Sequence, residues 1–138
     1  MIKVTNKLSK QGADIRYNVF IIEQGFNVEI DELDQSCLHV VYYLNDIAVA
    51  ACRFYKEDEL GTYHLGRFAV SKEYRNKHVG FDMLNEVIQY IKSIGGNKVV
   101  LSAQLDAVGF YLKCGFVVTS DVYYEQHCPH KDMEFFIK

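Results

Sequence analysis

The stretch FAVSKEYRNKHVGF, residues 68–81, decides the fold. An apolar strand runs into a short basic turn, and the turn opens at Gly80 into an amphipathic helix. A helix start directs unpaired backbone N–H groups and the positive end of the helix dipole at the turn that precedes it. The stretch therefore predicts a binding site for an anion, above all a phosphate or pyrophosphate.

Length and composition indicate one globular domain over residues 1–138. Of the 138 residues, 49% are hydrophobic and 24% are charged, and a single Pro argues against a linker between two units. The net charge of −3 disfavours attraction to nucleic acid or to an anionic membrane. No apolar run approaches the roughly 18 residues of a membrane span, and the N-terminus lacks the apolar segment of a signal peptide.

The cysteines favour a reducing compartment. They show no C-x-x-C spacing, and three of the four lie in apolar or strand-like runs that are typical of reduced, buried thiols. We therefore expect a cytoplasmic protein, with neither nucleic acid nor membrane as a partner; a homodimer is left open. The four cysteines are Cys37, Cys52, Cys114 and Cys128.

Hydrophobic periodicity predicts the elements of the chain. Leu84, Val87, Ile88 and Ile91 lie at helical spacing, and Asn45-Asp46 between alternating apolar runs indicates a hairpin. A helix separates the strands before and after it at the centre of the chain, so those two strands are expected to be parallel neighbours. The expected strands span residues 2–5, 38–44, 47–55, 62–71, 98–103, 116–120 and 133–137, and the expected helices span 11–24, 80–94 and 105–113.

This order of elements predicts an α+β domain with a mixed, mostly antiparallel sheet flanked by helices and one parallel strand pair. No G-x-G-x-x-G follows the first strand, which disfavours a dinucleotide-binding fold. A long polar connection, with His127, Cys128, Pro129 and His130, joins the last two strands. Because no second ligand pair lies at zinc-site spacing, we expect no metal.

Residues 27–35 form an acidic segment that allows two interpretations. It contains Glu29, Asp31, Glu32 and Asp34 among a few apolar residues. Charge clusters usually face water, so a solvated loop or short helix is one interpretation. The other is an acidic rim over a pocket that receives a cationic substrate.

Two runs carry a resemblance to a known family. RNKHVG, residues 75–80, joins a strand to a helix, and QLDAVGFYLKCGF, residues 104–116, covers the last helix. They resemble the Arg/Gln-x-x-Gly-x-Gly/Ala and Asn-x-x-Ala-x-x-Phe-Tyr-x-x-x-Gly-Phe motifs of the GCN5-related N-acetyltransferase (GNAT) superfamily, with His78 in place of the middle Gly and Gln104 in place of the Asn. Residues 19–25, 29–31 and 129–130 are similar to small bacterial members.

The resemblance implies the acyl-CoA N-acyltransferase fold, with the parallel pair at the CoA cleft and acetyl-CoA as acyl donor. Backbone N–H groups at the helix start would bind the pyrophosphate, and the fourth strand would line the pantetheine arm and polarise the thioester carbonyl. Because helix entries mostly use conformations open to any residue, His78 is expected to be tolerated. The implied cofactor contacts are Phe68, Ala69, Val70, Arg75, Asn76, Lys77, His78, Val79, Gly80, Phe81, Gln104 and Phe110.

The resemblance also implies one catalytic residue, Tyr111, as the acid that protonates the leaving thiolate. A phenol titrates near pH 10, close to an alkyl thiol, and can share a proton with it. The base that deprotonates the amine is not assigned, because Gly66 stands where many relatives carry a Glu. His39, His64 and His130 are the alternatives.

Two functions remain open at this point. The first is an acetyl-CoA-dependent N-acetyltransferase acting on the primary amine of a small, cationic acceptor, with Glu29, Asp31, His64 and His130 as candidate acceptor-binding residues. The second is a catalytically silent CoA-binding sensor or regulatory module, which Gly66 and His78 favour. The identity of the acceptor is not legible in the sequence.

Overall fold

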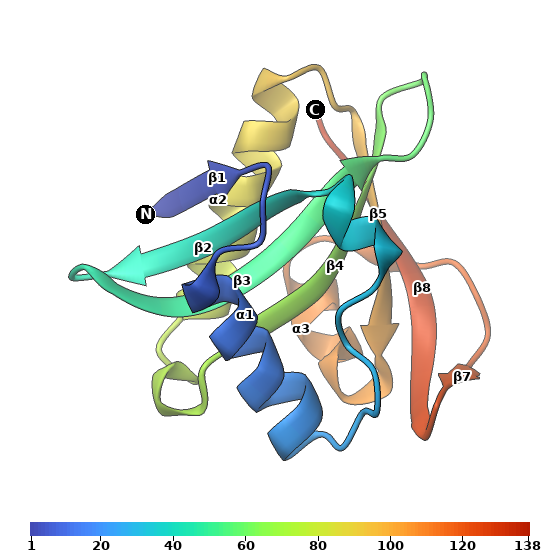
Figure 1. Ribbon diagram of the computed structural model, residues 1–138. Helices are drawn as coiled ribbons and strands as arrows, with labels where there is room; N and C mark the ends of the chain where they lie inside the picture. Colours follow the sequence, from blue (N-terminus) through green and yellow to red (C-terminus); the bar gives the residue numbers. More distant parts are fainter.

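The computed structural model describes all 138 residues, and its core is one eight-stranded mixed sheet with helices on both faces (Figure 1). The strand order is β1-β2-β3-β4-β5-β8-β6, and β7 also pairs with β8. The strands are β1 Ile2–Thr5, β2 Leu38–Leu44, β3 Ile47–Lys56, β4 Thr62–Val70, β5 Lys98–Gln104, β6 Val117–Val118, β7 Tyr123–Glu125 and β8 Cys128–Phe136. The helices are α1 Lys10–Arg16, η1 Tyr17–Glu23, η2 Glu32–Gln35, η3 Lys72–Tyr74, α2 Val79–Ser93, η4 Leu105–Ala107 and α3 Val108–Lys113.

The sheet has a single parallel pair, formed by β4 and β5. Thr62–Leu65 lies next to Lys98–Leu101, and α2 makes the crossover between the two strands. All other pairs are antiparallel. The predicted α+β class is therefore confirmed. The predicted β2–β3 turn is confirmed too, because Asn45 and Asp46 adopt the φ of 50° and 67° that a tight two-residue hairpin needs.

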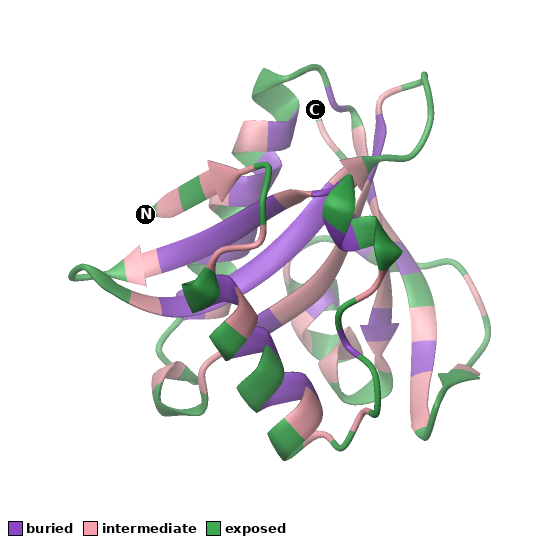
Figure 2. Cartoon of the chain, in the orientation of Figure 1, coloured by how far each residue is buried: buried purple, intermediate pink, exposed green.

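Two apolar cores lie on the two faces of the sheet (Figure 2). The larger core is under α2, whose Met83, Leu84, Val87 and Ile91 are fully buried at the spacing that the sequence predicts. The smaller core is under α1 and η1 and contains Ile15, Val19, Phe20, Ala51 and Ala69. None of the helices combines the length and the apolar character that crossing a membrane requires.

The helix expected over residues 11–24 is two helices in sequence. Ser9 caps α1 by accepting the Gly12 N–H, and from Tyr17 the chain continues as the π-helix η1. The Gln24 N–H donates to the carbonyl of Val19, five residues earlier, as a π-helix requires. The run Val19-Phe20-Ile21-Ile22 is apolar throughout, so its pattern could not distinguish this helix from an α-helix.

The C-terminal strands also differ from the prediction. The strand expected at 116–120 is reduced to β6, and the strand expected at 133–137 begins earlier, at Cys128. The polar connection is therefore largely a β7–β8 hairpin, in which Pro129 faces Tyr124. This stretch contains a Pro and mostly polar residues, so it lacks the alternation of apolar and polar residues that predicts a strand. The last expected helix is the short η4 followed by α3.

Candidate active site

A cavity of about 1120 Å³ opens where β4 and β5 separate. Their pairing ends at Leu65 and Leu101, and beyond this point β5 pairs only with β8. A bulge bends β4 here, because Arg67 and Phe68 together lie opposite Cys52 of β3, and Arg67 has a φ of 51°. One edge of β4 from Gly66 to Val70 is thus left without a partner strand.

A row of unpaired backbone donors borders the cavity. The N–H groups of residues 76–81, which we call the anion-binding loop, donate no hydrogen bond within the chain. The first bond of α2 is from the Asp82 N–H to the His78 carbonyl at 2.9 Å, and no side chain caps the helix. Consecutive free N–H groups at a helix start attract anions. The local feature that the sequence predicts is therefore present.

Gly80 lets the anion-binding loop pack closely on two aromatic rings. A Cβ on Gly80 would lie 3.5 Å from Phe110, 3.5 Å from Val70 and 3.6 Å from Phe68, which is ordinary contact that leaves no room for a longer side chain. The Phe68 and Phe110 rings pack together at 5.9 Å between centroids. The structure thus brings the expected β4, loop and α3 residues together at one cavity, except Lys77, which does not line it.

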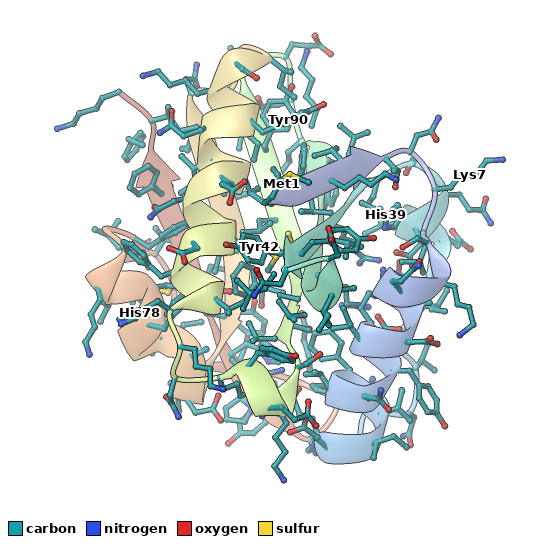
Figure 3. The ribbon with its side chains drawn as sticks, turned by 90° about the vertical axis from the view of Figure 1, so that its left-hand side faces the viewer. Met1, Lys7, His39, Tyr42, His78 and Tyr90 are labelled. Atoms are coloured by element: carbon teal, nitrogen blue, oxygen red, sulfur yellow. The ribbon has the colours of Figure 1, made fainter.

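His78 has a left-handed backbone, with φ 62° and ψ 12° (Figure 3). The expectation that any residue suits this helix entry is wrong, because a side chain at positive φ crowds the following carbonyl and costs about 1–2 kcal/mol. Asn76 also has a left-handed backbone, with a φ of 60°, and Asn is a residue type that tolerates this conformation well. The side chain of His78 is exposed, so it does not fill the cavity.

The two basic side chains expected at the phosphates have partners within the chain. Arg75 forms two hydrogen bonds of 2.8 Å with the Glu23 carboxylate and donates from Nε to the Val70 carbonyl at 3.1 Å. The Arg75 hydrogen bond lowers the pKa of Glu23. Lys77 lies 5.7 Å from the centre of the Tyr74 ring. Arg75 therefore fastens η1 to the anion-binding loop.

Tyr111 lies on α3 between three aromatic rings and lines the cavity. Its ring centre is 5.9 Å from Phe68, 5.1 Å from Phe110 and 5.5 Å from Phe116. Its hydroxyl makes no hydrogen bond within the chain. Burial raises the pKa of Tyr111 well above its ordinary value. The phenol carries its proton at neutral pH, as a donor must, but the raised pKa makes it a weaker acid than the free phenol whose pKa lies close to that of a thiol.

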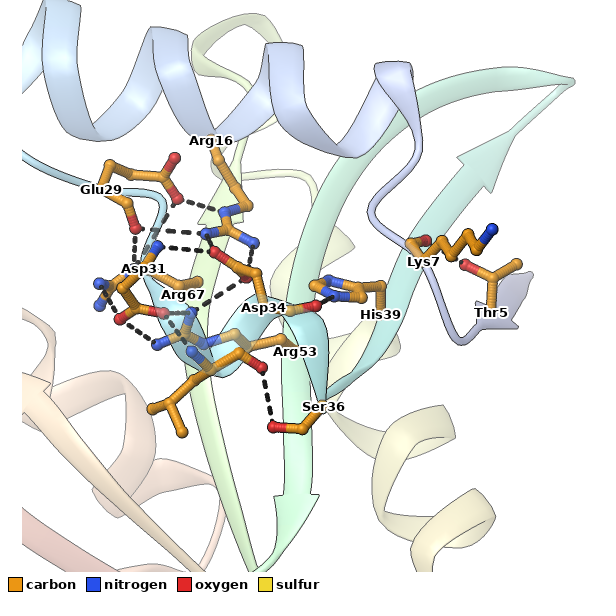
Figure 4. A network of polar contacts seen from close by, with 11 residues as sticks. Thr5, Lys7, Arg16, Glu29, Asp31, Asp34, Ser36, His39, Arg53 and Arg67 are labelled. Carbon is orange, nitrogen blue, oxygen red and sulfur yellow. Dashed lines mark hydrogen bonds and ion pairs between the residues drawn. The ribbon is translucent and has the colours of Figure 1, made fainter.

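The acidic segment contains the short helix η2, as one interpretation allowed, and Glu32 is exposed, but arginines bind the other three carboxylates, so it is not an open acidic rim (Figure 4). Glu29 is 5% exposed and its carboxylate accepts a hydrogen bond from Arg16 Nε. Asp34 binds both ends of the Arg16 guanidinium, at 2.7 and 3.0 Å, and Asp31 binds both ends of Arg53, at 2.6 and 3.0 Å. With Arg67, these residues form what we call the arginine–carboxylate network.

The network is balanced in charge, with three arginines and three carboxylates. Burial raises the pKa of Asp34, but hydrogen bonds from Arg16, the Asp31 N–H and Arg53 outweigh it and hold that pKa far below the ordinary value. The argument for a cationic acceptor is thereby removed, because Glu29 and Asp31 already have cationic partners. The three arginines are Arg16, Arg53 and Arg67.

Sequence reasoning missed these arginines as well as Gln24. A signal was present for two of them: Arg53 sits inside the apolar run AVAACRFY and Arg16 on the apolar side of a helix, and buried arginines are nearly always paired. Gln24 follows η1, and its Oε1 accepts from Gln104 Nε2 at 2.6 Å. Gln104 therefore fastens the end of η1 to the end of β5.

The three candidate histidines lie in different places. His39 is buried beside the network, where Nε2 is 2.8 Å from the Asp34 carbonyl, and it does not line the cavity. His64 lines the cavity, stacks on Tyr55 and lies 3.2 Å from a Glu57 oxygen. His130 also lines the cavity and is 5% exposed.

Comparisons with known proteins agree with this geometry. The family described as "Acetyltransferase (GNAT) domain" matches residues 4–136. The uncharacterized N-acetyltransferase YjcF of Bacillus subtilis is 33% identical over 122 residues, covering 86% of each chain. Protein ElaA of Escherichia coli is 31% identical over 124 residues, covering 86% of this chain and 81% of its own.

Solved structures show the same fold. The crystal structure of Escherichia coli ElaA, at 28% identity, superposes with a TM-score of 0.82 over 97% of this chain and 99% of its own. An aminoglycoside 6'-N-acetyltransferase complexed with coenzyme A is similar in fold alone, at 15% identity and a TM-score of 0.74 over 99% of this chain and 96% of its own.

Proposed function

The chain belongs to the GNAT acetyltransferase family, and we propose that it moves an acetyl group from acetyl-CoA to the primary amine of a small acceptor. The observation that carries the proposal is the placement of the anion-binding loop beside the open edge of β4. The loop suits a pyrophosphate, and the open edge of β4 suits the extended, amide-rich pantetheine arm. Both border the cavity that Tyr111 lines.

The residues present fit CoA on two points. Six successive N–H groups, from Asn76 to Phe81, are free to bind phosphate oxygens, and Gly80 keeps the space over Phe68 and Phe110 clear. Acetyl-CoA supplies the acetyl group, activated as a thioester. The unpaired edge of β4 would hold the arm, and an N–H between Phe68 and Val70 would polarise the carbonyl. The CoA complex of the aminoglycoside acetyltransferase supports this donor.

His130 is the residue best suited to accept the proton of the amine. Its Nδ1 lies 2.9 Å from the Cys128 carbonyl, and because a carbonyl only accepts, Nδ1 carries the hydrogen in the neutral ring. The lone pair is then on Nε2. The Glu125 carboxylate, 3.9 Å from Nε2, would stabilise the imidazolium that forms.

Strand register supports separate roles for the proposed base and acid, because His130 points to the face of the sheet away from Tyr111. Leu101 and Met133 are register partners and point into the core under α2, on the side of Tyr111. Gln104 and His130 are partners three residues further on, so they point to the other face, where Gln104 reaches Gln24. An amine could thus approach from the η1 side while the thiolate leaves toward Tyr111.

One assay separates the enzyme from the silent module. Purified protein is incubated with acetyl-CoA and a panel of primary amines, and free thiol is measured together with CoA affinity by calorimetry. Turnover on any amine supports the proposal. Tight CoA binding without turnover on every amine would instead favour the sensor or regulatory module.

The proposed base is tested in the same assay. We expect His130→Gln to lower kcat roughly 10²–10⁴-fold, to leave CoA affinity unchanged, and to respond to added imidazole. His64→Gln is the comparison, since His64 also lines the cavity. A larger loss of kcat in His64→Gln than in His130→Gln would transfer the role to His64.

The cytoplasmic location stays part of the proposal. All four cysteines are free thiols, and Cys37 and Cys52 are buried. Burial raises the pKa of the Cys52 thiol, which keeps it protonated and unreactive. These features suit a reducing compartment.

A further inference from the structure

Arg67 is the most exposed arginine of the arginine–carboxylate network, of which Glu29, Asp31 and Arg53 also line the cavity. Its side chain is 28% exposed, whereas those of Arg16 and Arg53 are 1% and 5% exposed. It occupies the bulge of β4 and lines the cavity directly before Phe68. Its backbone φ of 51° shows that the chain holds it in a conformation that a side chain seldom adopts.

Arg67 has hydrogen-bond donors to spare. Its Nε donates to the Glu29 carbonyl at 2.9 Å, and Nη2 donates to Asp31 Oδ2 at 3.1 Å. Nη1 has no partner in the chain, and Nη2 retains a second hydrogen. The outer edge of this guanidinium is therefore available to a ligand, while its inner edge is fixed.

The neighbouring carboxylates already accept hydrogen bonds from several groups. Asp31 accepts from Arg53, Arg67 and the Leu33 N–H, and Asp34 accepts from Arg16, Arg53 and the Asp31 N–H. Burial lowers the pKa of Arg67, and the charges of Arg53 and Arg16 lower it further, against the opposite effect of Asp31 and Glu29. A carboxylate bound at the free edge of Arg67 would favour its charged form, as the carboxylates of Asp31 and Glu29 do.

We propose that the free edge of Arg67 binds a carboxylate of the acceptor, so that the acceptors are amines that also carry a carboxylate, with amino acids as the chemical class. The inference rests on the proposed function. A guanidinium presents two parallel N–H groups that match a carboxylate, and in a partly buried cavity such a pair is stronger and more selective than at a surface. Arg67 and Phe68 both line the cavity, so a small molecule held at Arg67 would share it with the proposed transfer site.

The carboxylates elsewhere in the cavity are compatible with an acceptor whose own carboxylate binds Arg67 and whose amine lies further away. Glu125 of β7 and Asp106 of η4 also line the cavity, and no arginine pairs with either of them. An amino acid could place its carboxylate at Arg67 and its amine toward His130 and Glu125. The acceptor would then be recognised at both ends, with charges of opposite sign.

Matched pairs of amines test the inference. Thiol release from acetyl-CoA is measured with lysine and cadaverine, phenylalanine and phenethylamine, and histidine and histamine, which differ in each pair only by the carboxylate. We expect kcat/KM to be higher for the carboxylate-bearing member by about 10-fold or more, because a site built around a buried charge strongly rejects the analogue that leaves it unpaired.

Variants connect the preference to Arg67. Arg67→Gln should remove the preference for the carboxylate, and Arg67→Lys should retain part of it, since Lys keeps the charge and loses the paired donors. CoA affinity and thermal unfolding of each variant show whether the fold is preserved. The comparison within the parent protein needs no variant, so a variant that fails to fold does not prevent the test.

The outcomes are distinct. Equal or better turnover of the decarboxylated amines would overturn the inference and leave the proposed function standing. A preference that survives in a folded Arg67→Gln would overturn the role of Arg67. Absence of turnover with all amines, while CoA still binds, would overturn the proposed function and the inference with it.

Discussion

At the scale of single residues, His78 is held in a conformation that Gly adopts without strain. Replacing it by Gly removes a cost of about 1–2 kcal/mol but adds flexibility to the unfolded chain, so we expect His78→Gly to raise the free energy of unfolding by about 0.5–1 kcal/mol. Urea unfolding measures the difference. His78→Val is the matched control and should destabilise, since a β-branched side chain tolerates positive φ poorly. A destabilised His78→Gly would contradict the left-handed backbone.

Tyr111 yields a prediction on catalysis rather than on stability. Its hydroxyl has no partner in the chain, so removing it should leave the free energy of unfolding nearly unchanged. If the phenol protonates the leaving thiolate, Tyr111→Phe should lower kcat about 10²-fold or more and spare CoA affinity. Tyr124→Phe is the control, because Tyr124 is 68% exposed and does not line the cavity. The role of Tyr111 as the acid would be refuted by an unchanged kcat.

At the scale of elements, the start of α2 is expected to govern CoA binding. Gly80→Glu would place a longer, negative side chain against Phe68 and Phe110 and beside the free N–H groups. We expect CoA affinity to fall about 10-fold or more through charge repulsion and lost space, while an acidic residue in the first turn keeps the helix stable. Gly80→Ala is the matched control, because its Cβ meets only ordinary contacts at 3.5 Å. Calorimetry with CoA measures both; full affinity in Gly80→Glu would mean that CoA binds elsewhere.

Elements with a local cause were predictable from the sequence. The apolar spacing of α2, the Asn45-Asp46 turn and the single β4–β5 crossover follow from residues near one another in the chain. The anion-binding loop was found for the same reason, whereas Phe68, Phe110 and Tyr111 were indicated by the resemblance to the family motifs. The β7–β8 hairpin and the π-helix η1 were not, because neither has a distinctive pattern of apolar residues.

The remaining parts of the site depend on tertiary structure. Arg16, Arg53 and Arg67 come from α1, β3 and β4, and they meet the carboxylates of residues 29–34 only once the sheet has formed. The acidic segment by itself suggested a solvated surface or a cation site. Its partners lie as many as 38 residues away along the chain, so a local pattern can mark an arginine as buried but cannot identify the carboxylate that it binds.

At the scale of the whole molecule, the network joins the cover of the cavity to the sheet. It links α1, the segment from Glu29 into η2, β3 and β4, and Arg67 is the most exposed of its arginines that keep unpaired donors. A guanidinium buried with one of its carboxylates removed is costly, by roughly 3–5 kcal/mol in comparable pairs. The network therefore supports both the fold and the acceptor side of the site. Asp34 and Asp31 each accept four hydrogen bonds, and Asp34 is the more deeply buried of the two.

The network predicts how stability depends on pH. The pKa of Asp34 is lower in the folded chain than in the unfolded chain, where an Asp titrates near pH 3.9, so the folded state binds fewer protons. This contribution is fully present above about pH 5 and is lost as the pH falls through and below 4 toward the depressed pKa.

Asp34→Asn should lower the free energy of unfolding by roughly 3–5 kcal/mol at pH 7 and flatten its decline in acid, because the proton-linked carboxylate is gone. Urea unfolding from pH 7 to pH 3 measures both effects. Asp121→Asn, at an exposed residue without an ion pair, should keep the parent's acid decline, and an equally steep decline in Asp34→Asn would show that the network does not carry it.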